Sequence, residues 1–336
     1  MTTQNKKRRD FVKKTSLLAL GALTLNSQSL IAKSKAEAVQ TWYITGASGG
    51  LGYELAKYLL AKGDRVALTS RKIANLEKKF GKESENMLFL ELKFDKDLDA
   101  QIKSNMQKIK AKFKRLDNVV NNAGYGLLGF VEEVSERELR EQFEVNLFAP
   151  FLIVQNALKM MRQQCKNESG SEENIRARIF NLSSIAGFRV PSASGAYSMS
   201  KFALSALSES LNVDLRDFGI ATINVMPAGF RTEFLGTSLK FSEGKIADYD
   251  AKREINLQNV KNFNGKQAGN PQKFAPVIYE ISRQKNPPFY LFMGDAAFKS
   301  ARNKIAWVEA DMKRTQSYAG SAVDFDDAKG RAFDRR

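Results

Sequence analysis

The chain of 336 residues contains no histidine and only one cysteine, Cys165. The missing histidines exclude Ser-His-Asp and Cys-His nucleophilic catalysis, together with every metal site that needs a histidine ligand. A single cysteine cannot form an intrachain disulfide or a cysteine-rich zinc site, so we interpret Cys165 as an ordinary helix residue. We expect no metal cofactor, and any chemistry must come from other residue types.

Charge is unbalanced, because 53 Lys and Arg residues outnumber 37 Asp and Glu residues and give a net charge of +16. Residues 1–38 contribute +6 of this excess. The other basic residues are scattered along the chain, which favours a solvated surface over a nucleic-acid groove. We therefore expect no nucleic-acid partner, although a basic surface would also suit anionic components of a cell envelope.

The N-terminal segment has too little uninterrupted apolar length to span a membrane. Paired Arg8 and Arg9 precede an apolar run from Leu17 to Ile31 that polar residues dilute. Ala36-Glu37-Ala38 then forms a small-x-small cleavage pattern. This order resembles a twin-arginine export signal, which predicts a signal peptide at 1–38, contact with the export machinery and a periplasmic mature protein. The alternative is a basic tail on a cytoplasmic protein.

Glycine is concentrated at 41–52 (TWYITGASGGLG), and the rest of the chain is organised around this stretch. A β-prone run, Trp42–Thr45, precedes the glycines, and a helical pattern runs from Tyr53 to Lys62. A strand, a glycine turn and a helix together deliver a phosphate to the free N–H groups of the helix N-terminus. We predict a dinucleotide site here, with binding residues Gly46, Ser48, Gly50, Leu51 and Gly52.

The end of the next predicted strand, Arg65–Thr69, lacks an acidic residue. In dinucleotide-binding folds an acid at this point binds the ribose 2′-hydroxyl, whereas an arginine accommodates a 2′-phosphate. Ser70 and Arg71 follow the strand here, which favours NADP over NAD. The alternative is that Arg71 is a surface residue at the start of the next helix.

Strand and helix patterns alternate through the rest of the chain. They predict strands at 87–94, 116–120, 177–182, 221–226 and 289–292, and helices at 97–113, 135–161, 197–218, 271–283 and 295–313. Alternation of this kind implies an α/β fold with a doubly wound parallel sheet. We expect one Rossmann-like domain at 39–316 with a C-terminal helical extension. A surface loop is expected at 165–178 and a disordered polar tail at 317–336.

The catalytic candidate is Tyr197 with Lys201, which share a helix face at i and i+4. A nearby cation favours the phenolate and would lower the pKa of Tyr197, so that it exchanges a proton with a substrate oxygen. The same spacing occurs in Tyr53/Lys57 and Tyr58/Lys62, which we interpret as surface pairs. The third pair differs because Ser184 stands thirteen residues earlier, at the end of a predicted buried strand.

These motifs occur in the order of one known family. Thr45-Gly46-xxx-Gly50-x-Gly52, Asn121-Asn122-Ala123-Gly124, Asn146, Ser184, Tyr197-xxx-Lys201 and Pro227-Ala228-Gly229 together resemble the short-chain dehydrogenase/reductase family from about Gln40 to Thr232. The resemblance implies that Tyr197 is the general acid/base, that Lys201 also binds the nicotinamide ribose, and that Ser184 bonds the reacting oxygen. It further implies a water-holding role for Asn146 and cofactor contacts at Asn122, Ala123, Pro227 and Thr232.

We therefore predict an NADP(H)-dependent oxidoreductase that interconverts a carbonyl and an alcohol of a small-molecule substrate. Residues 229–269 would form the substrate loop, either as an apolar lid or simply as a cover for the core. One alternative function is a dinucleotide-binding protein without turnover, such as a redox sensor or scaffold. Another is a binder of nucleic acid or of the envelope surface that depends on the basic charge. The resemblance also implies a homo-oligomer built through helices 135–161 and 197–218, unless the C-terminal helix covers them within one chain.

Overall fold

The computed structural model describes residues 38–167 and 175–327, and all of the elements below lie within the compact unit Gln40–Arg336. Seven parallel strands form the main sheet in the order β3-β2-β1-β4-β6-β7-β9. The order reverses between β1 and β4, which confirms the doubly wound parallel sheet. The strands are β1 (Thr41–Ile44), β2 (Arg65–Ser70), β3 (Met87–Glu91), β4 (Asn118–Asn121), β6 (Ala177–Leu182), β7 (Ile220–Pro227) and β9 (Tyr290–Met293).

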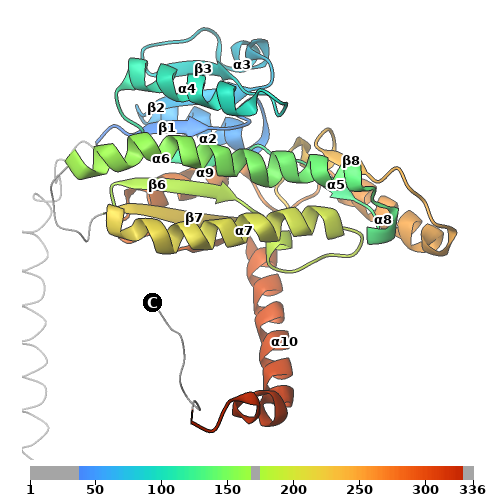
Figure 1. Cartoon of the computed structure of the whole chain (residues 1–336). Helices are drawn as coiled ribbons and strands as arrows, with labels where there is room; N and C mark the ends of the chain where they lie inside the picture. The colour runs from blue at the N-terminus through green and yellow to red at the C-terminus, as the bar shows by residue number, and fades with distance from the viewer. Residues whose placement is uncertain (1–37, 168–174, 328–336) are drawn as a thin grey trace, which may run out of the picture. The chain divides into compact units, whose positions relative to one another are not determined.

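Helices cover both faces of this sheet (Figure 1). One layer contains α2 (Gly50–Ala61), α3 (Ile73–Phe80) and α9 (Pro271–Arg283), and the other contains α4 (Leu98–Phe113), α6 (Ala149–Asn167) and α7 (Gly195–Leu215). Side chains alternate between the layers along each strand. In β1, for example, Trp42 and Ile44 enter one core and Tyr43 enters the other. Burial on both faces explains why the strands were visible in the sequence as apolar runs.

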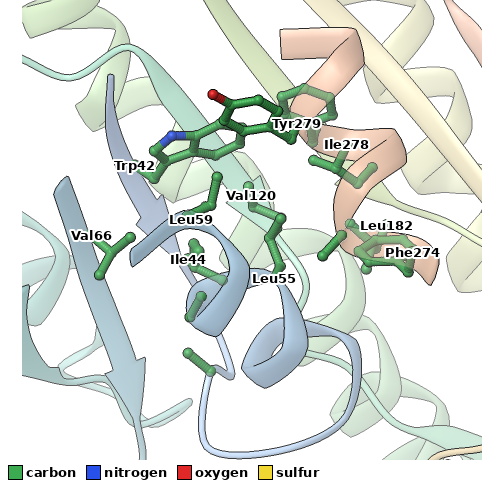
Figure 2. Packing of buried hydrophobic residues seen from close by; sticks show 14 of the residues in the cluster. Trp42, Ile44, Leu55, Leu59, Val66, Val120, Leu182, Phe274, Ile278 and Tyr279 are labelled. Atoms are coloured by element: carbon green, nitrogen blue, oxygen red, sulfur yellow. The ribbon is translucent and has the colours of Figure 1, made fainter. Parts of the chain in front are cut away.

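Figure 2 shows the core between the sheet and the layer of α2 and α9. Trp42 packs with its ring 5.9 Å from that of Phe180, and Tyr279 of α9 lies edge-on to Tyr58 of α2 at 5.6 Å. The indole N–H of Trp42 donates to Asp64 at 2.9 Å, and Arg283 pairs with the same carboxylate at 2.8 Å. This packing fixes α2, and with it the glycine turn, against the carboxyl end of β1.

The predicted helix at 135–161 is built from three pieces. α5 (Glu136–Phe143) has the expected capping box of Ser135 and Glu138, a π-helical turn η2 spans Glu144–Phe148, and α6 continues to Asn167. The loop predicted from residue 165 therefore begins too early, and Cys165 is a buried residue of α6. Residues 168–174 of that loop lie outside the described part of the chain.

The region 229–269 is more ordered than a simple loop. It contains η5 (Glu233–Leu235), β8 (Leu239–Phe241), η6 (Ala247–Tyr249) and α8 (Asp250–Phe263). β8 pairs in parallel with β5 (Gly126–Leu128) in a second, two-stranded sheet that the sequence patterns did not indicate. Elsewhere in the described residues there are four further 3₁₀ turns: η1 (Val131–Glu133), η3 (Ile185–Gly187), η4 (Arg216–Phe218) and η7 (Ser321–Val323).

The last helix, α10 (Asp295–Ala319), is longer than predicted, so the tail expected from residue 317 begins within a helix. Residues 1–37 and 328–336, which hold the predicted export signal and the end of that tail, lie outside the described residues. Within the described ranges, none of the helices is both long enough and apolar enough to cross a membrane.

Candidate active site

The predicted catalytic residues meet at the carboxyl ends of β4 and β6, beside the point where the strand order reverses. Tyr197 and Lys201 lie on the first turns of α7, and Ser184 follows β6. The Lys201 ammonium donates to the carbonyl oxygen of Leu182 at 2.7 Å and lies 5.9 Å from the ring centroid of Tyr197. In doubly wound sheets, ligands bind at the carboxyl edge beside the reversal of strand order, which is where these three residues lie.

Burial controls the protonation of both groups. It raises the pKa of Tyr197 to about 12, against a smaller lowering by a hydrogen bond with Ser184. It also lowers the pKa of Lys201 to about 8. We predicted that Lys201 lowers the pKa of Tyr197. In the structure burial has the larger effect and raises this pKa, and the contribution of the lysine stays a prediction. Tyr197 is therefore protonated at neutral pH.

Asn146 is oriented by the π-helical turn that contains it. Its amide nitrogen donates to the Tyr125 carbonyl and to the Ser200 hydroxyl, each at 3.0 Å. Its oxygen accepts the backbone N–H of Tyr125 at 3.2 Å. A π turn shifts the side chains by part of a turn relative to an α-helix, and such turns concentrate at functional sites. Asn146 is buried next to the Tyr197–Lys201 pair as a result.

The two other Tyr–Lys pairs have a different environment. Tyr53 packs on Phe80 with ring centroids 5.2 Å apart, and Tyr58 packs on Tyr279. Their lysines, Lys57 and Lys62, are exposed, whereas Lys201 is only 4% exposed. Burial of the cation therefore separates the catalytic candidate from its two surface counterparts.

The glycine turn fits a dinucleotide phosphate. Gly46 and Gly50 have left-handed φ angles of 66° and 55°, which residues other than glycine rarely adopt. Helix α2 has neither a capping side chain nor an acidic residue in its first turn, so the N–H groups of that turn have no side-chain acceptor. A Cβ added at Gly49 would meet nothing within 4 Å. This open, uncapped helix start has the geometry and the partial positive charge that bind anions.

The end of β4 is tied to the glycine turn. The Thr45 hydroxyl accepts the backbone N–H groups of Asn122 and Ala123, both at 2.9 Å. The Asn122 amide donates to the carbonyls of Thr45 at 2.8 Å and Gly46 at 3.2 Å. A Cβ at Gly52 would stand 2.5 Å from that amide nitrogen. Asn122 and Gly52 therefore fix the conformation of the glycine turn, and Ala123 belongs to the same contact between the end of β4 and the turn.

The remaining predicted cofactor residues surround this turn. The buried Ser70 hydroxyl donates to the Ser48 hydroxyl at 3.4 Å, while Arg71 is exposed at the end of β2. Leu51 is partly buried in the first turn of α2. Pro227 ends β7, and the Thr232 side chain stands about 3.7 Å from a Cβ built on Gly50. All of the predicted site residues thus lie along one edge of the sheet.

Three supporting residues were not singled out as site residues from the sequence. A Cβ on Gly124 would lie 3.1 Å from the Asn146 oxygen and 3.5 Å from the Lys201 nitrogen, so a side chain there would crowd both. Ser200 and Tyr125 supply the hydrogen-bonding groups that hold Asn146. Gly124 could have been found from the sequence, because it belongs to the motif Asn121–Gly124. The contacts of Ser200 and Tyr125 could not, because they depend on the π turn.

Aromatic side chains pack beside the ring of Tyr197 and further along the region 229–269. The Phe234 ring is 5.8 Å from that of Tyr197, and Phe130 stacks on Tyr249 at 4.2 Å. The segment that carries Tyr249 is held by the buried carboxylate of Glu133, which accepts the N–H of Ile246 at 3.0 Å and pairs with Arg253. The region 229–269 is therefore fastened to η1, and its Phe234 lies next to Tyr197.

Comparison with known proteins agrees with this geometry. A family model described as short chain dehydrogenase matches residues 40–242. An uncharacterized oxidoreductase of Schizosaccharomyces pombe is 30% identical over 291 residues, which cover 86% of this chain and 94% of the relative. A 3-ketodihydrosphingosine reductase of Bacteroides thetaiotaomicron is 29% identical over 273 residues, which cover 80% of this chain and 93% of the relative.

Among solved structures, a short-chain dehydrogenase from Streptomyces avermitilis superimposes with a TM-score of 0.75 at 29% identity. The match covers 86% of this chain and all of that one. The family model, the sequence relatives and the shared fold lead to the same assignment, which the glycine turn and the Ser184, Tyr197 and Lys201 cluster had indicated: the chain belongs to the short-chain dehydrogenase/reductase family and is an NAD(P)-dependent oxidoreductase.

Proposed function

We propose that this enzyme is an NADP(H)-dependent reductase in which Tyr197 protonates the oxygen of a substrate carbonyl. The observation that carries this proposal is the buried cluster of Ser184, Tyr197 and Lys201 beside an uncapped helix start. When bound, the cofactor supplies the hydride. The protein supplies orientation, electrostatics and the proton.

Each residue has a separate task in this scheme. Ser184 donates a hydrogen bond to the substrate oxygen and holds it within reach of the Tyr197 hydroxyl. Because the pKa of Tyr197 is about 12, the residue is protonated at neutral pH and ready to give its proton to the alkoxide that forms. Lys201 stabilises the phenolate left behind, since a buried cation next to the ring opposes the charge that develops.

The preference for NADP rests on the end of β2. Arg71 is exposed beside the buried Ser70, and among the described residues it has no ion-pair partner. A free guanidinium next to the adenosine end of the site suits a 2′-phosphate, which it can bind in bidentate fashion. No acidic side chain stands at Thr69, Ser70 or Arg71 to repel that phosphate.

The substrate is an apolar carbonyl compound. Phe234 and Leu239 press against Gly126 so closely that a Cβ there would lie 2.9 Å from Leu239 and 3.2 Å from Phe234. Apolar and aromatic side chains next to a few polar groups are the usual lining of a small-molecule site. The name of the Bacteroides relative, 3-ketodihydrosphingosine reductase, agrees with a ketone substrate.

A substrate screen tests the proposed function. The purified enzyme would be mixed with NADPH and a series of ketones of increasing chain length, and the loss of NADPH absorbance would be followed. We expect turnover that improves with apolar chain length. Tight NADPH binding without turnover of any ketone, aldehyde or alcohol would contradict the proposal and would instead favour a binding protein.

We further propose a homo-oligomer built through α6 and α7. Four side chains are at least 39% exposed: Phe148 at the end of η2, Phe151 at the start of α6, and Met199 and Phe202 on α7. The alternative that the C-terminal helix covers them is wrong, because they remain exposed in the presence of α10. Burying these four side chains against a symmetric copy would be favourable.

We also propose that residues 1–38 direct export of the folded enzyme to the periplasm. A dinucleotide made in the cytoplasm can be bound only after the sheet and the glycine turn have formed, and its binding stabilises the folded state. A route that moves folded protein would preserve the bound cofactor. The paired Arg8 and Arg9 and the Ala36-Glu37-Ala38 pattern support this route.

A further inference from the structure

Helix α10 leaves the domain soon after it begins. Its first turns lie near β9 and η3, where Ala297 and Ala301 are at most 4% exposed. Beyond them the side chains are open to solvent, and Ile305, Val308 and Met312 are 47%, 42% and 64% exposed. Figure 1 shows the helix running away from the sheet. Most of its length therefore has no cover from the described residues.

Apolar residues form a stripe along α10, in which Ala301 is buried and the other members are exposed. Phe298, Ala301, Ile305, Val308 and Met312 are spaced alternately by three and four residues, which is the seam of a helix that pairs with another helix. An isolated helix of about fifteen residues is marginal in water, and most helical stability comes from packing of an apolar face. The segment from Ile305 to Ala319 therefore needs a partner for its stripe.

The charges that border the stripe identify the partner. Lys304 and Asp311 lie on one edge of the stripe, and Arg302 and Glu309 lie on the other. Against an identical helix running in the opposite direction, with Ile305 across from Val308 of the second copy, Lys304 meets Asp311 of that copy. Arg302 likewise meets Glu309 of that copy. The twofold axis repeats both pairs, so this register forms four pairs of opposite charge.

We propose that α10 pairs antiparallel with α10 of a second copy of this chain and links two protomers through a surface separate from α6 and α7. The central layers stack Ile305 on Val308 of the other copy. A parallel arrangement would match Lys304 with Glu309 alone. An anionic membrane surface suits the helix less well, because Glu309 and Asp311 lie directly beside the stripe.

Cysteine cross-linking tests both the pairing and its direction. The only native cysteine, Cys165, is buried and serves as background. Full-length Ile305→Cys and Val308→Cys variants would carry different tags and would be oxidised mildly, alone and as a mixture. We expect cross-links between the two tags in the mixture and at least about tenfold fewer in either variant alone. Cross-links within a single variant, or none in any sample, would overturn the proposal.

Light scattering of charge variants gives an independent test. The double change Arg302→Glu and Lys304→Glu should halve the mass of the assembly. Mixing this variant with a chain that carries Glu309→Lys and Asp311→Lys should restore the native mass. Trp307→Ala removes an exposed apolar side chain on another side of the helix and should change nothing. An unchanged mass in the first variant, or co-sedimentation of the native protein with phosphatidylglycerol vesicles in place of self-association, would overturn the proposal.

Discussion

Replacing Lys201 with methionine should abolish activity and yet make the folded protein more stable at neutral pH. Burial lowers the pKa of Lys201 from 10.5 to about 8. At about 1.4 kcal/mol for each pKa unit, keeping this ammonium buried at pH 7 costs about 3 kcal/mol of folding free energy. The variant also loses the hydrogen bond to the Leu182 carbonyl, worth about 1 kcal/mol. The expected net gain is about 2 kcal/mol.

The pH dependence separates this cause from a general packing effect. Between pH 8 and pH 10.5 the unfolded chain keeps the lysine proton and the folded enzyme has released it, so the stability of the native enzyme rises with pH in this window. Methionine has no such proton. The advantage of the variant should therefore shrink from about 2 kcal/mol at pH 7 to nothing, or to a small loss, near pH 10.5.

Urea unfolding of both proteins at several pH values between 7 and 10.5 measures this difference. Lys57→Met is the matched control, because Lys57 stands at the same spacing from Tyr53 but is exposed. Its stability should stay within about 0.5 kcal/mol of the native value. A Lys201→Met protein that is less stable at pH 7, or a stability difference that does not change with pH, would refute the reasoning.

Three other outcomes follow from the site and the N-terminus. Arg71→Ala should narrow the preference for NADPH over NADH by about 1–3 kcal/mol, and calorimetry showing equal affinities in the native enzyme would count against a 2′-phosphate site. Gly124→Ala should lower turnover at least about tenfold, because the new methyl group displaces Asn146 and Lys201. Native turnover in this variant would show that these two side chains tolerate a methyl group at residue 124. Changing Arg8 and Arg9 to Lys should leave an active precursor in the cytoplasm, and fractionation that finds it in the periplasm would refute the export route.

The main sheet was predictable because its strands are buried on both faces. Such strands produce short, continuous apolar runs, as in Ala177–Leu182, and the polar residues that follow them mark the carboxyl edge. Ser184 and Tyr197 could be placed together for the same reason, since the sequence put one at a strand end and the other at the start of the next helix. The structure brings both to that edge.

Other features had no signal in the sequence. β5 and β8 are three residues each and pair across more than a hundred residues, so no local pattern identifies them. The π turn around Asn146 depends on packing rather than on helix propensity. The raised pKa of Tyr197 was missed because the spacing to Lys201 shows the neighbouring cation but not the degree of burial. Burial is set by the whole fold.

The central claim, proton transfer by Tyr197, is tested most directly by Tyr197→Phe measured beside Tyr53→Phe. Both changes remove one hydroxyl from a tyrosine four residues before a lysine, and Tyr53 packs on Phe80 through its ring. With any ketone that the native enzyme reduces, Tyr197→Phe should keep NADPH affinity within a few-fold and lose about 10²-fold or more in turnover. Tyr53→Phe should match the native enzyme. Near-native turnover by Tyr197→Phe, or an equal loss in both variants, would contradict the account.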